Sequence, residues 1–329
     1  MQVWRAPEDI PEQLGGTVVT VGVFDGVHRG HQAVLGRVVE LARQRGLTSV
    51  VLTFDPHPSA VHNPSHPAHL IGTLEDRLNR IEALGVDAVF VQQYTLEYAQ
   101  ASPAEFVEGQ LIGQLHARAI VVGEDVRFGC ANTGDGAFLR AEGRRLGVSV
   151  ELIPDQFGAD GHRWSSTRVR ECLAAGDMAG AQAVLGRAHR IVGVVSHGAR
   201  RGRELGFPTA NLEGPDLGEV PADGVYAGWL VREVPGTEAA EYLPAAISVG
   251  TNPQFNGVTR TVEAHVLGRA DLHLYGERVA IDFVERIRPM LTFASVEELL
   301  HRMDQDLRET ARILGVPVSR RVNPRDVTA

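Results

Sequence analysis

The chain has 329 residues, more than most single hydrophobic cores contain, so two domains are expected. It is 43% hydrophobic and 22% charged, which is typical of a soluble globular protein, and its formal net charge of −9 argues against nucleic acid as the main partner. All 32 of its Lys and Arg residues are Arg. Because a Walker A loop and a protein-kinase site both need Lys, these two classes of ATP site are excluded.

Targeting, membrane and metal signatures are absent from the sequence. The first residues lack the apolar core of a signal peptide, and no run approaches the roughly 20 apolar residues of a membrane span. Cys130 and Cys172 lie far apart and outside the spacings of zinc sites and disulfide frameworks. We therefore expect a cytoplasmic protein with small-molecule substrates and no membrane or nucleic-acid partner. A monomer and a homo-oligomer both remain open.

The first informative stretch is Val18–His31, VVTVGVFDGVHRGH. An apolar run typical of a buried strand ends at Gly22, and a helical pattern begins near Gln32. A strand, a Gly-rich turn and a helix start form a natural anion site. The first N–H groups of a helix lack internal partners, and the helix dipole adds positive charge there. His28 and His31 are one turn apart and can face the same phosphate.

Strand and helix patterns alternate through the rest of the first half. Helices are expected at Ala33–Arg45, Thr73–Leu84, Pro103–Leu115 and Asp135–Leu146, and strands at Ser49–Phe54, Ala88–Gln92, Ala119–Gly123 and Val148–Leu152. This βα alternation predicts a doubly wound α/β domain with a parallel sheet, whose ligands gather at the carboxyl ends of the strands. Phe24 and Asp25 would then lie beside the segment from Phe54 to Pro58.

A second cluster of phosphate-binding groups is Ser165–Arg170, SSTRVR. Hydroxyl residues at a helix start are typical N-caps, and a helix is expected to about Ala175, so a plain cap is one interpretation. Two Arg residues after three hydroxyls exceed what a cap requires. Arg168 or Arg170 could contact the β- and γ-phosphates of ATP with its planar guanidinium.

The periodicity changes after a short helix expected at Ala179–Leu185. Short alternating strands typical of an antiparallel barrel are expected at Ile191–His197, Gly224–Val231, Pro244–Val249, Thr261–Val266 and Arg278–Ile287. Ser295 would cap a terminal helix that runs to Leu314, before Gly315. We therefore divide the chain into domains 1–186 and 187–329.

The informative block of the second half is Gly193–Asn211, GVVSHGARRGRELGFPTAN. In an extended segment Thr209 and Asn211 would point to the same side, which suits a hard cation such as Mg²⁺ beside phosphate oxygens. An ordinary Gly/Pro loop with an Asx turn is the alternative interpretation.

Ordered motifs along the chain resemble a known family. In the first half GVFDGVHRGHQ, TFDPHP, VGEDVRFG and SSTRVR are similar to the bacterial bifunctional riboflavin kinase/FAD synthetases. In the second half GRELGFPTAN, Glu263-Ala264-His265 and Leu274-Tyr275-Gly276 resemble the riboflavin kinase module of that family. The resemblance extends from about Val18 to Leu314. It implies a doubly wound α/β nucleotidyltransferase domain followed by an antiparallel β-barrel riboflavin kinase domain with a C-terminal helix.

The resemblance also implies an activity and site residues. ATP would phosphorylate riboflavin to FMN, and a second ATP would adenylylate FMN to FAD with release of pyrophosphate, with Mg²⁺ at both steps. ATP in the adenylyltransferase is expected at Gly22, Phe24, Asp25, Gly26, His28, Gly30, His31, Ser165, Ser166, Thr167 and Arg168, with His28 and His31 catalytic. FMN there is expected at Phe54, Pro56, His57, Asp125, Arg127 and Phe128. ATP in the kinase is expected at Gly193, His197, Gly198, Gly206, Pro208, Thr209 and Asn211, with Thr209 and Asn211 as metal ligands and Glu263 as the catalytic base.

The chemistry of the two reactions agrees with these residue types. The FMN phosphate is already ionised, so adenylyl transfer needs positioning and charge stabilisation rather than a base. The ribityl hydroxyl of riboflavin must lose a proton, which calls for a base such as Glu263. The alternatives are a solvated strand carboxylate for Glu263 and a turn residue between two prolines for His57. For the whole chain they are a nucleotidyltransferase of another specificity, such as a cytidylyltransferase, or a flavin-binding regulator without catalysis.

Some positions depart from the family pattern. They are Val126, Ala199-Arg200, Gly268 and His273. Val126 replaces an aromatic residue that is frequent in the family, so the resemblance implies no flavin stacking at that position. The other departures lie outside the expected base and metal ligands.

Overall fold

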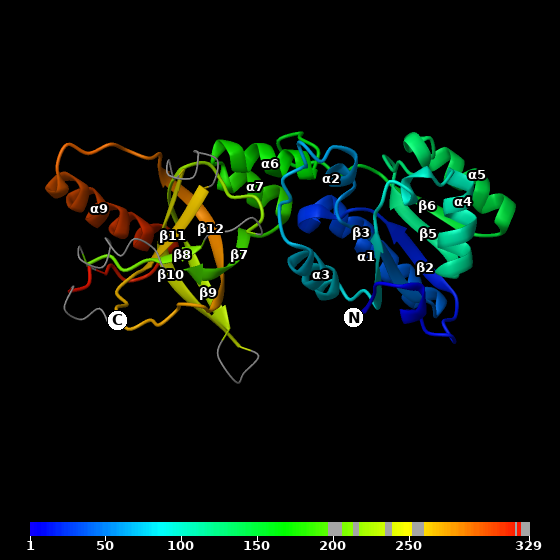
Figure 1. Ribbon diagram of the computed structural model, residues 1–329, viewed down its shortest axis with the longest axis horizontal. Coiled ribbons are helices and arrows are strands. Elements are labelled where there is room, and N and C mark those ends of the chain that lie inside the picture. Colours follow the sequence, from blue (N-terminus) through cyan, green and yellow to red (C-terminus); the bar gives the residue numbers. More distant parts are fainter. Residues whose placement is uncertain (197–205, 213–216, 234–238, 252–259, 320, 324–329) are drawn as a thin grey trace. The chain divides into compact units, whose positions relative to one another are not determined.

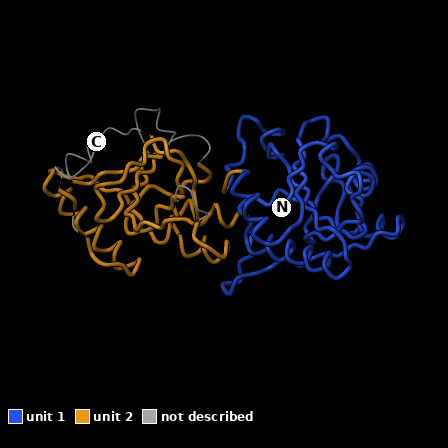
Figure 2. Tube along the Cα trace, turned by 90° about the horizontal axis from the view of Figure 1, so that it is seen from below, with its two compact units in different colours: residues 1–70, 74–166 blue, residues 71–73, 167–329 orange. Residues whose placement is uncertain are grey.

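The computed structural model describes residues 1–196, 206–212, 217–233, 239–251, 260–319 and 321–323 (Figure 1). Packing divides the chain into two compact units, residues 1–70 with 74–166 and residues 71–73 with 167–329 (Figure 2). This division falls between Ser166 and Thr167, earlier than the domain boundary expected near Gly186. The reason is that helices α6 (Ser166–Ala175) and α7 (Met178–Leu185) pack with the second unit, where α7 contacts two strands of the barrel.

The first unit is built on a six-stranded parallel sheet in the order β1-β4-β3-β2-β5-β6. Its strands are β1 (Gln2–Trp4), β2 (Thr17–Val21), β3 (Thr48–Asp55), β4 (Ala88–Gln93), β5 (Ala117–Gly123) and β6 (Ser149–Ile153). Its helices are α1 (Arg29–Arg45), α2 (Pro58–His62), α3 (Leu74–Ala83), α4 (Pro103–Glu105), a π-helix at Phe106–Gln114 and α5 (Gly136–Leu146). The expected doubly wound architecture is confirmed, with β1 and α2 as elements that the sequence patterns did not predict.

Helices cover both faces of this sheet because the buried strand residues alternate in direction. Val50 and Leu52 pack in one core cluster with Leu111 of the π-helix, whereas Val51 packs in another with Leu35 of α1 and residues of α3. Strands buried on both faces explain the continuous apolar runs in the sequence. The carboxyl ends of β2, β3 and β4 lie side by side in this sheet, so the loops that follow them share one edge.

The second unit is a closed antiparallel barrel in the order β10-β11-β8-β7-β12-β9. Its strands are β7 (His189–Ser196), β8 (Ala210–Leu212), β9 (Gly224–Glu233), β10 (Ala240–Thr251), β11 (Arg260–Val266) and β12 (Arg278–Arg288). The predicted barrel is confirmed. The additional strand is β8, which contains the Ala and Asn of the PTAN motif and pairs with both β7 and β11.

Helix α9 (Val296–Leu314) packs against the barrel through its contacts with β9, β10 and β12. Ser295 caps it as expected, and its hydroxyl accepts a hydrogen bond from the Glu298 N–H at 3.1 Å. The Arg288 guanidinium on β12 forms a buried ion pair with Asp306 of α9, with Nη2 to Oδ2 at 2.7 Å. Within the described part of the chain, no helix is long and apolar enough to cross a lipid bilayer.

Candidate functional site

The turn after β2 has an unusual backbone. Phe24 lies in the left-handed region with φ 55°, Gly26 has φ 74°, and a 3₁₀ turn spans Asp25–Val27. Phe24 and Asp25 are buried. Non-glycine residues with positive φ are uncommon and concentrate at functional sites. This buried turn therefore connects β2 to the start of α1.

His28 is the N-cap of α1, so the helix begins at Arg29 and not near Gln32 as the sequence pattern indicated. Its Nδ1 accepts a hydrogen bond from the His31 N–H at 3.3 Å. The two imidazoles stack with their centroids 3.6 Å apart, and the Phe24 ring meets His31 edge-on at 5.2 Å. The structure thus brings the predicted histidine pair together at the positive end of a helix dipole.

The side chain of His31 is held in its neutral form. Burial lowers its pKa well below the usual value, and the neighbouring charges of His28, Arg77 and Arg163 lower it further. Its Nδ1 atom is buried and forms no hydrogen bond with any residue that the structure describes. A neutral imidazole retains one N–H, which can donate to an anionic oxygen without the cost of burying a second charge.

The predicted hydroxyl cluster meets the turn through Ser166, whose hydroxyl donates to the Asp25 carbonyl at 2.9 Å. Gly30 lies in a crowded place, because a Cβ there would lie 3.1 Å from the His28 ring and 3.2 Å from the Trp164 carbonyl. Thr167 and Arg168 follow Ser166 in the first turn of α6 and belong to the second unit, where Arg168 forms a 3.4 Å ion pair with Glu171. Ser165 is half-buried in the first unit.

The carboxyl end of β3 provides an aromatic surface at the same sheet edge. Phe54 packs edge-on against Tyr94 at 5.5 Å and lies 6.1 Å from Tyr98, both of which follow β4. Burial raises the pKa of both tyrosines above the usual value. The sequence interpretation missed the two tyrosines, although the position of Tyr94 directly after a buried strand was a usable signal.

The peptide bond between Asp55 and Pro56, at the start of the loop that follows β3, is cis. His57 caps α2, and its Nδ1 accepts a hydrogen bond from the Ser59 N–H at 3.0 Å. This contact gives His57 a local structural role. Its expected place in the flavin site stays a prediction.

The other predicted flavin residues lie after β5. The Asp125 carboxylate pairs with Arg163, and Arg127 donates to the Val126 carbonyl at 2.9 Å. Phe128 is buried, with its ring between those of Phe106 and Phe138. Gly134 has no room for a Cβ beside the Phe128 ring, which explains the glycine. Phe128 therefore contributes to the core behind this surface.

A buried arginine on α3 is a further residue that the sequence interpretation missed. Arg77 is 5% exposed, and its Nη1 donates to the Val23 carbonyl at 2.6 Å and to the Phe54 carbonyl at 3.3 Å. The available signal was its position on the apolar stripe of the helix, between Leu74 and Ile81.

In the second unit the PTAN motif lies against the predicted base. Asn211 of β8 is paired with Glu263 of β11, and the Thr209 hydroxyl donates to the Glu263 carboxylate at 3.4 Å. Asn211 is buried, and its carbonyl accepts a hydrogen bond from Ser196 at 3.4 Å. The structure therefore gathers hydroxyl, amide and carboxylate oxygens that come from distant parts of the sequence.

His265 supports the same segment from β11. It is 4% exposed, and its Nδ1–H donates to the Pro208 carbonyl at 2.8 Å, while its buried Nε2 has no hydrogen-bond partner among the described residues. Burial lowers the pKa of His265, and the hydrogen bond to Pro208 opposes that shift. The neutral imidazole thus anchors the peptide that precedes Thr209.

The remaining predicted kinase residues differ in role. Gly193 lies in β7, where an added Cβ would come within 2.5 Å of Leu217, so barrel packing accounts for this glycine. Gly206 has φ 84°, a conformation that favours glycine. His197 and Gly198 lie outside the described residues.

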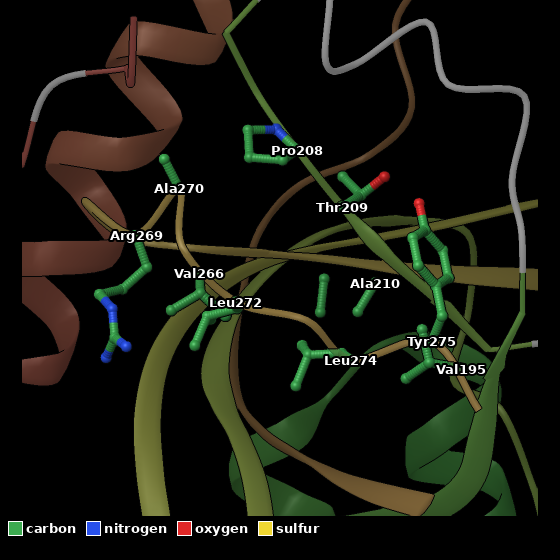
Figure 3. Close-up of a pocket in the computed structure, with 11 residues that line it drawn as sticks. Val195, Pro208, Thr209, Ala210, Val266, Arg269, Ala270, Leu272, Leu274 and Tyr275 are labelled. Atoms are coloured by element: carbon green, nitrogen blue, oxygen red, sulfur yellow. The ribbon is translucent and has the colours of Figure 1, made fainter. Parts of the chain in front are cut away.

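A pocket opens beside the PTAN segment (Figure 3). Its lining is Val195, Pro208, Thr209, Ala210, Ala264, Val266, Arg269, Ala270, Leu272, Leu274 and Tyr275. Most of these side chains are apolar, and the hydroxyls of Thr209 and Tyr275 point toward the same side in this view. An apolar cleft with a few polar groups at its rim is typical of a small-ligand site.

Comparisons with known proteins match both units of the chain. The family model described as FAD synthetase matches residues 10–168, and the model described as riboflavin kinase matches residues 185–314. A crystal structure from Streptococcus pneumoniae, described as a macrolide-efflux protein, has a TM-score of 0.79 and 29% identity. That match covers 94% of this chain and 98% of the other.

Curated relatives extend over almost the whole chain. A bifunctional riboflavin kinase/FMN adenylyltransferase of Pseudomonas fluorescens is 36% identical and covers 98% of this chain and 100% of the relative. Proteins with the same description from Haemophilus influenzae and Escherichia coli K12 are 34% and 35% identical, over 95% and 92% of this chain and 98% and 94% of theirs. The chain therefore belongs to the bifunctional riboflavin kinase/FMN adenylyltransferase family.

Proposed function

We propose that the second unit phosphorylates riboflavin with ATP to give FMN, and that the first unit adenylylates FMN to give FAD and pyrophosphate. The observation that carries this proposal is the presence of two separate motif sets in one chain, each matched by its own family model. Full-length relatives described by both activities support the same assignment.

In the kinase we assign Glu263 as the base that accepts the proton of the ribityl hydroxyl. An alcohol is a weak nucleophile until it loses its proton, so a positioned carboxylate accelerates the transfer. The Thr209 hydroxyl, 3.4 Å from the Glu263 carboxylate, holds one of its oxygens in place. The neighbouring apolar pocket, which is lined by Leu274 and Tyr275, suits the purine ring of ATP.

We propose that Mg²⁺ is held with ATP by Thr209 and Asn211. The donor chemistry fits, because hydroxyl and amide oxygens are ligands of hard cations and Mg²⁺ usually completes its shell with phosphate oxygens and water. Among the described residues no group of three or more His, Cys, Asp or Glu side chains is placed to hold a metal. A cation here would therefore depend on these oxygens and on ATP itself. When bound, Mg²⁺ neutralises charge on the phosphates.

In the adenylyltransferase we assign His28 and His31 to the phosphates of ATP. The FMN phosphate needs no base, so the task is to align the reacting groups and stabilise charge on the α- and β-phosphates. The start of α1 and the neutral N–H of His31 suit that task. Ser166 steadies the turn through Asp25, while Thr167 and Arg168 remain proposed ATP contacts on the strength of their motif. Phe54, Tyr94 and Tyr98 form a surface suited to the planar flavin.

The test is incubation of the purified chain with riboflavin, ATP and Mg²⁺, followed by chromatography of the flavins. FMN should appear first and FAD second, and a chelator should stop both steps. Replacing ATP with CTP in a parallel reaction separates this function from cytidylyl transfer. A His31→Ala variant should accumulate FMN. Normal FAD formation by that variant would refute the assignment of the His28–His31 turn.

A further inference from the structure

We propose that Arg77 is a positioning residue for adenylyl transfer, which fixes the segments after β2 and β3 in one relative geometry. The inference rests on the function proposed above for the first unit. Val23 directly precedes the Phe24 turn that leads to the histidine pair, and Phe54 is the next-to-last residue of β3, two residues before Pro56. A group that binds both carbonyls holds the ATP segment and the flavin segment together.

The hydrogen bonds of Arg77 converge on one nitrogen. Nη1 donates to the Val23 carbonyl at 2.6 Å, to the Thr53 hydroxyl at 3.1 Å and to the Phe54 carbonyl at 3.3 Å. The Thr53 hydroxyl donates in turn to the Val23 carbonyl at 3.1 Å. Arg77 lies on helix α3, which is separate from both strands. The helix thus clamps the carboxyl ends of two neighbouring strands from outside the sheet.

Core packing alone does not explain an arginine at this position. Arg77 lies on the buried stripe of α3 with Leu78 and Ile81, where an apolar side chain would pack without desolvating a charge. Burial lowers the pKa of Arg77, and the carboxylates of Asp25 and Asp55 oppose that shift. Asp25 begins the turn after β2 and Asp55 is the last residue of β3, so the guanidinium is matched by charge as well as by hydrogen bonds at both segments that it joins.

The charge of Arg77 also acts on the catalytic histidine. Burial is the largest cause of the lowered pKa of His31, and the charges of His28, Arg77 and Arg163 lower this pKa further. A neutral residue in place of Arg77 therefore raises the pKa of His31. If the reaction uses neutral His31, the acidic limb of the rate profile moves to higher pH, a shift that loss of packing alone would not produce.

The experiment compares Arg77→Met, Arg77→Lys and the matched control Arg80→Met in the full chain. Arg80 lies on the same helix and forms an ion pair with Asp76 at 2.6 Å. FAD formation from supplied FMN is measured against pH, and riboflavin phosphorylation by the same chain reports on the second unit. We expect Arg77→Met to lose about 100-fold in kcat/KM for adenylyl transfer, since a misplacement of about 1 Å has an effect of this size.

Further outcomes decide between positioning and a merely structural role. Arg77→Met should retain parental kinase activity and move the acidic limb of FAD formation to higher pH. Arg77→Lys, which keeps the charge, should leave the limb in place and recover part of the rate, and Arg80→Met should match the parent. Parental FAD formation by Arg77→Met, an unmoved limb, or an equal loss in Arg80→Met would overturn the proposal. A parent chain that makes no FAD from FMN would instead refute the function proposed for the first unit.

Discussion

Replacement of Glu263 by Gln should abolish most of the kinase activity while leaving the barrel intact. Gln has the same shape, and its amide oxygen can still accept the hydrogen bond that Thr209 donates at 3.4 Å. The substitution removes the capacity to accept a proton and preserves the contact on the neighbouring strand. The pairing of Glu263 with Asn211 uses the backbone, so it is also retained.

The expected size of the effect follows from the role of a general base. Such groups typically contribute 10²–10⁴-fold to the rate, which corresponds to about 2.7–5.5 kcal/mol in activation free energy. Because the Thr209 contact survives, KM for ATP should change little and the loss should fall on kcat. A solvated strand carboxylate, the competing interpretation of Glu263, would predict a change of less than twofold.

The assay follows FMN formation from riboflavin and, in a separate reaction, FAD formation from supplied FMN. Glu285→Gln is the matched control, since Glu285 is an exposed carboxylate on another strand of the same barrel. We expect Glu263→Gln to lose the first activity and keep the second, and the control to keep both. FMN formation at the parental rate by Glu263→Gln would show that the base lies elsewhere.

The remaining predictions concern pH, loop anchoring and stability. The folded chain holds His31 neutral at a lowered pKa, so the free energy of unfolding of the first unit should be full above about pH 6.5 and should fall below that pH, as the unfolded chain takes up the proton. Denaturation of the parent and of His31→Asn at pH 5.5 and 7.5 checks this. An equal change in the free energy of unfolding between the two pH values in both proteins would contradict it. His265→Leu leaves the Pro208 carbonyl without its donor and should raise the kinase KM for ATP about tenfold. His265→Asn keeps an N–H near the same place and should leave this KM unchanged. Equal KM values for the two variants would refute the anchoring role of His265. Asp306→Ala leaves the Arg288 guanidinium buried without its partner and should lower the free energy of unfolding of the second unit by about 3–5 kcal/mol. A decrease of less than about 1 kcal/mol in urea denaturation would contradict this.

Most of the fold could be predicted because its signals are local. Continuous apolar runs located most strands of the parallel sheet, alternating apolar residues located most strands of the barrel, and Ser295 was identified as the cap of the last helix. The main exceptions were short elements. β1 and β8 have three residues each, too few for a periodic pattern, and they exist because neighbouring strands supply their hydrogen bonds. The start of α1 was misplaced because His28, an uncommon cap, begins the helix.

The candidate site divides in the same way. His28, His31, Thr209 and Asn211 could be found from the sequence because each pair lies within one short motif, where the spacing sets the relative position. Glu263 entered only through the family resemblance. Its distance from Thr209 follows from the pairing of β8 with β11, which no local pattern encodes.

By itself the sequence determined the class of each domain, since strand periodicity and turn glycines depend on neighbours along the chain. It also determined the residue types available for phosphate chemistry, since the absence of lysine is a property of the composition. Only the tertiary structure decided that Arg77 joins the ends of β2 and β3 and that His265 anchors the PTAN segment. Both contacts link residues more than fifty positions apart. They depend on strand order and register, which the whole core fixes by burying every apolar face at once.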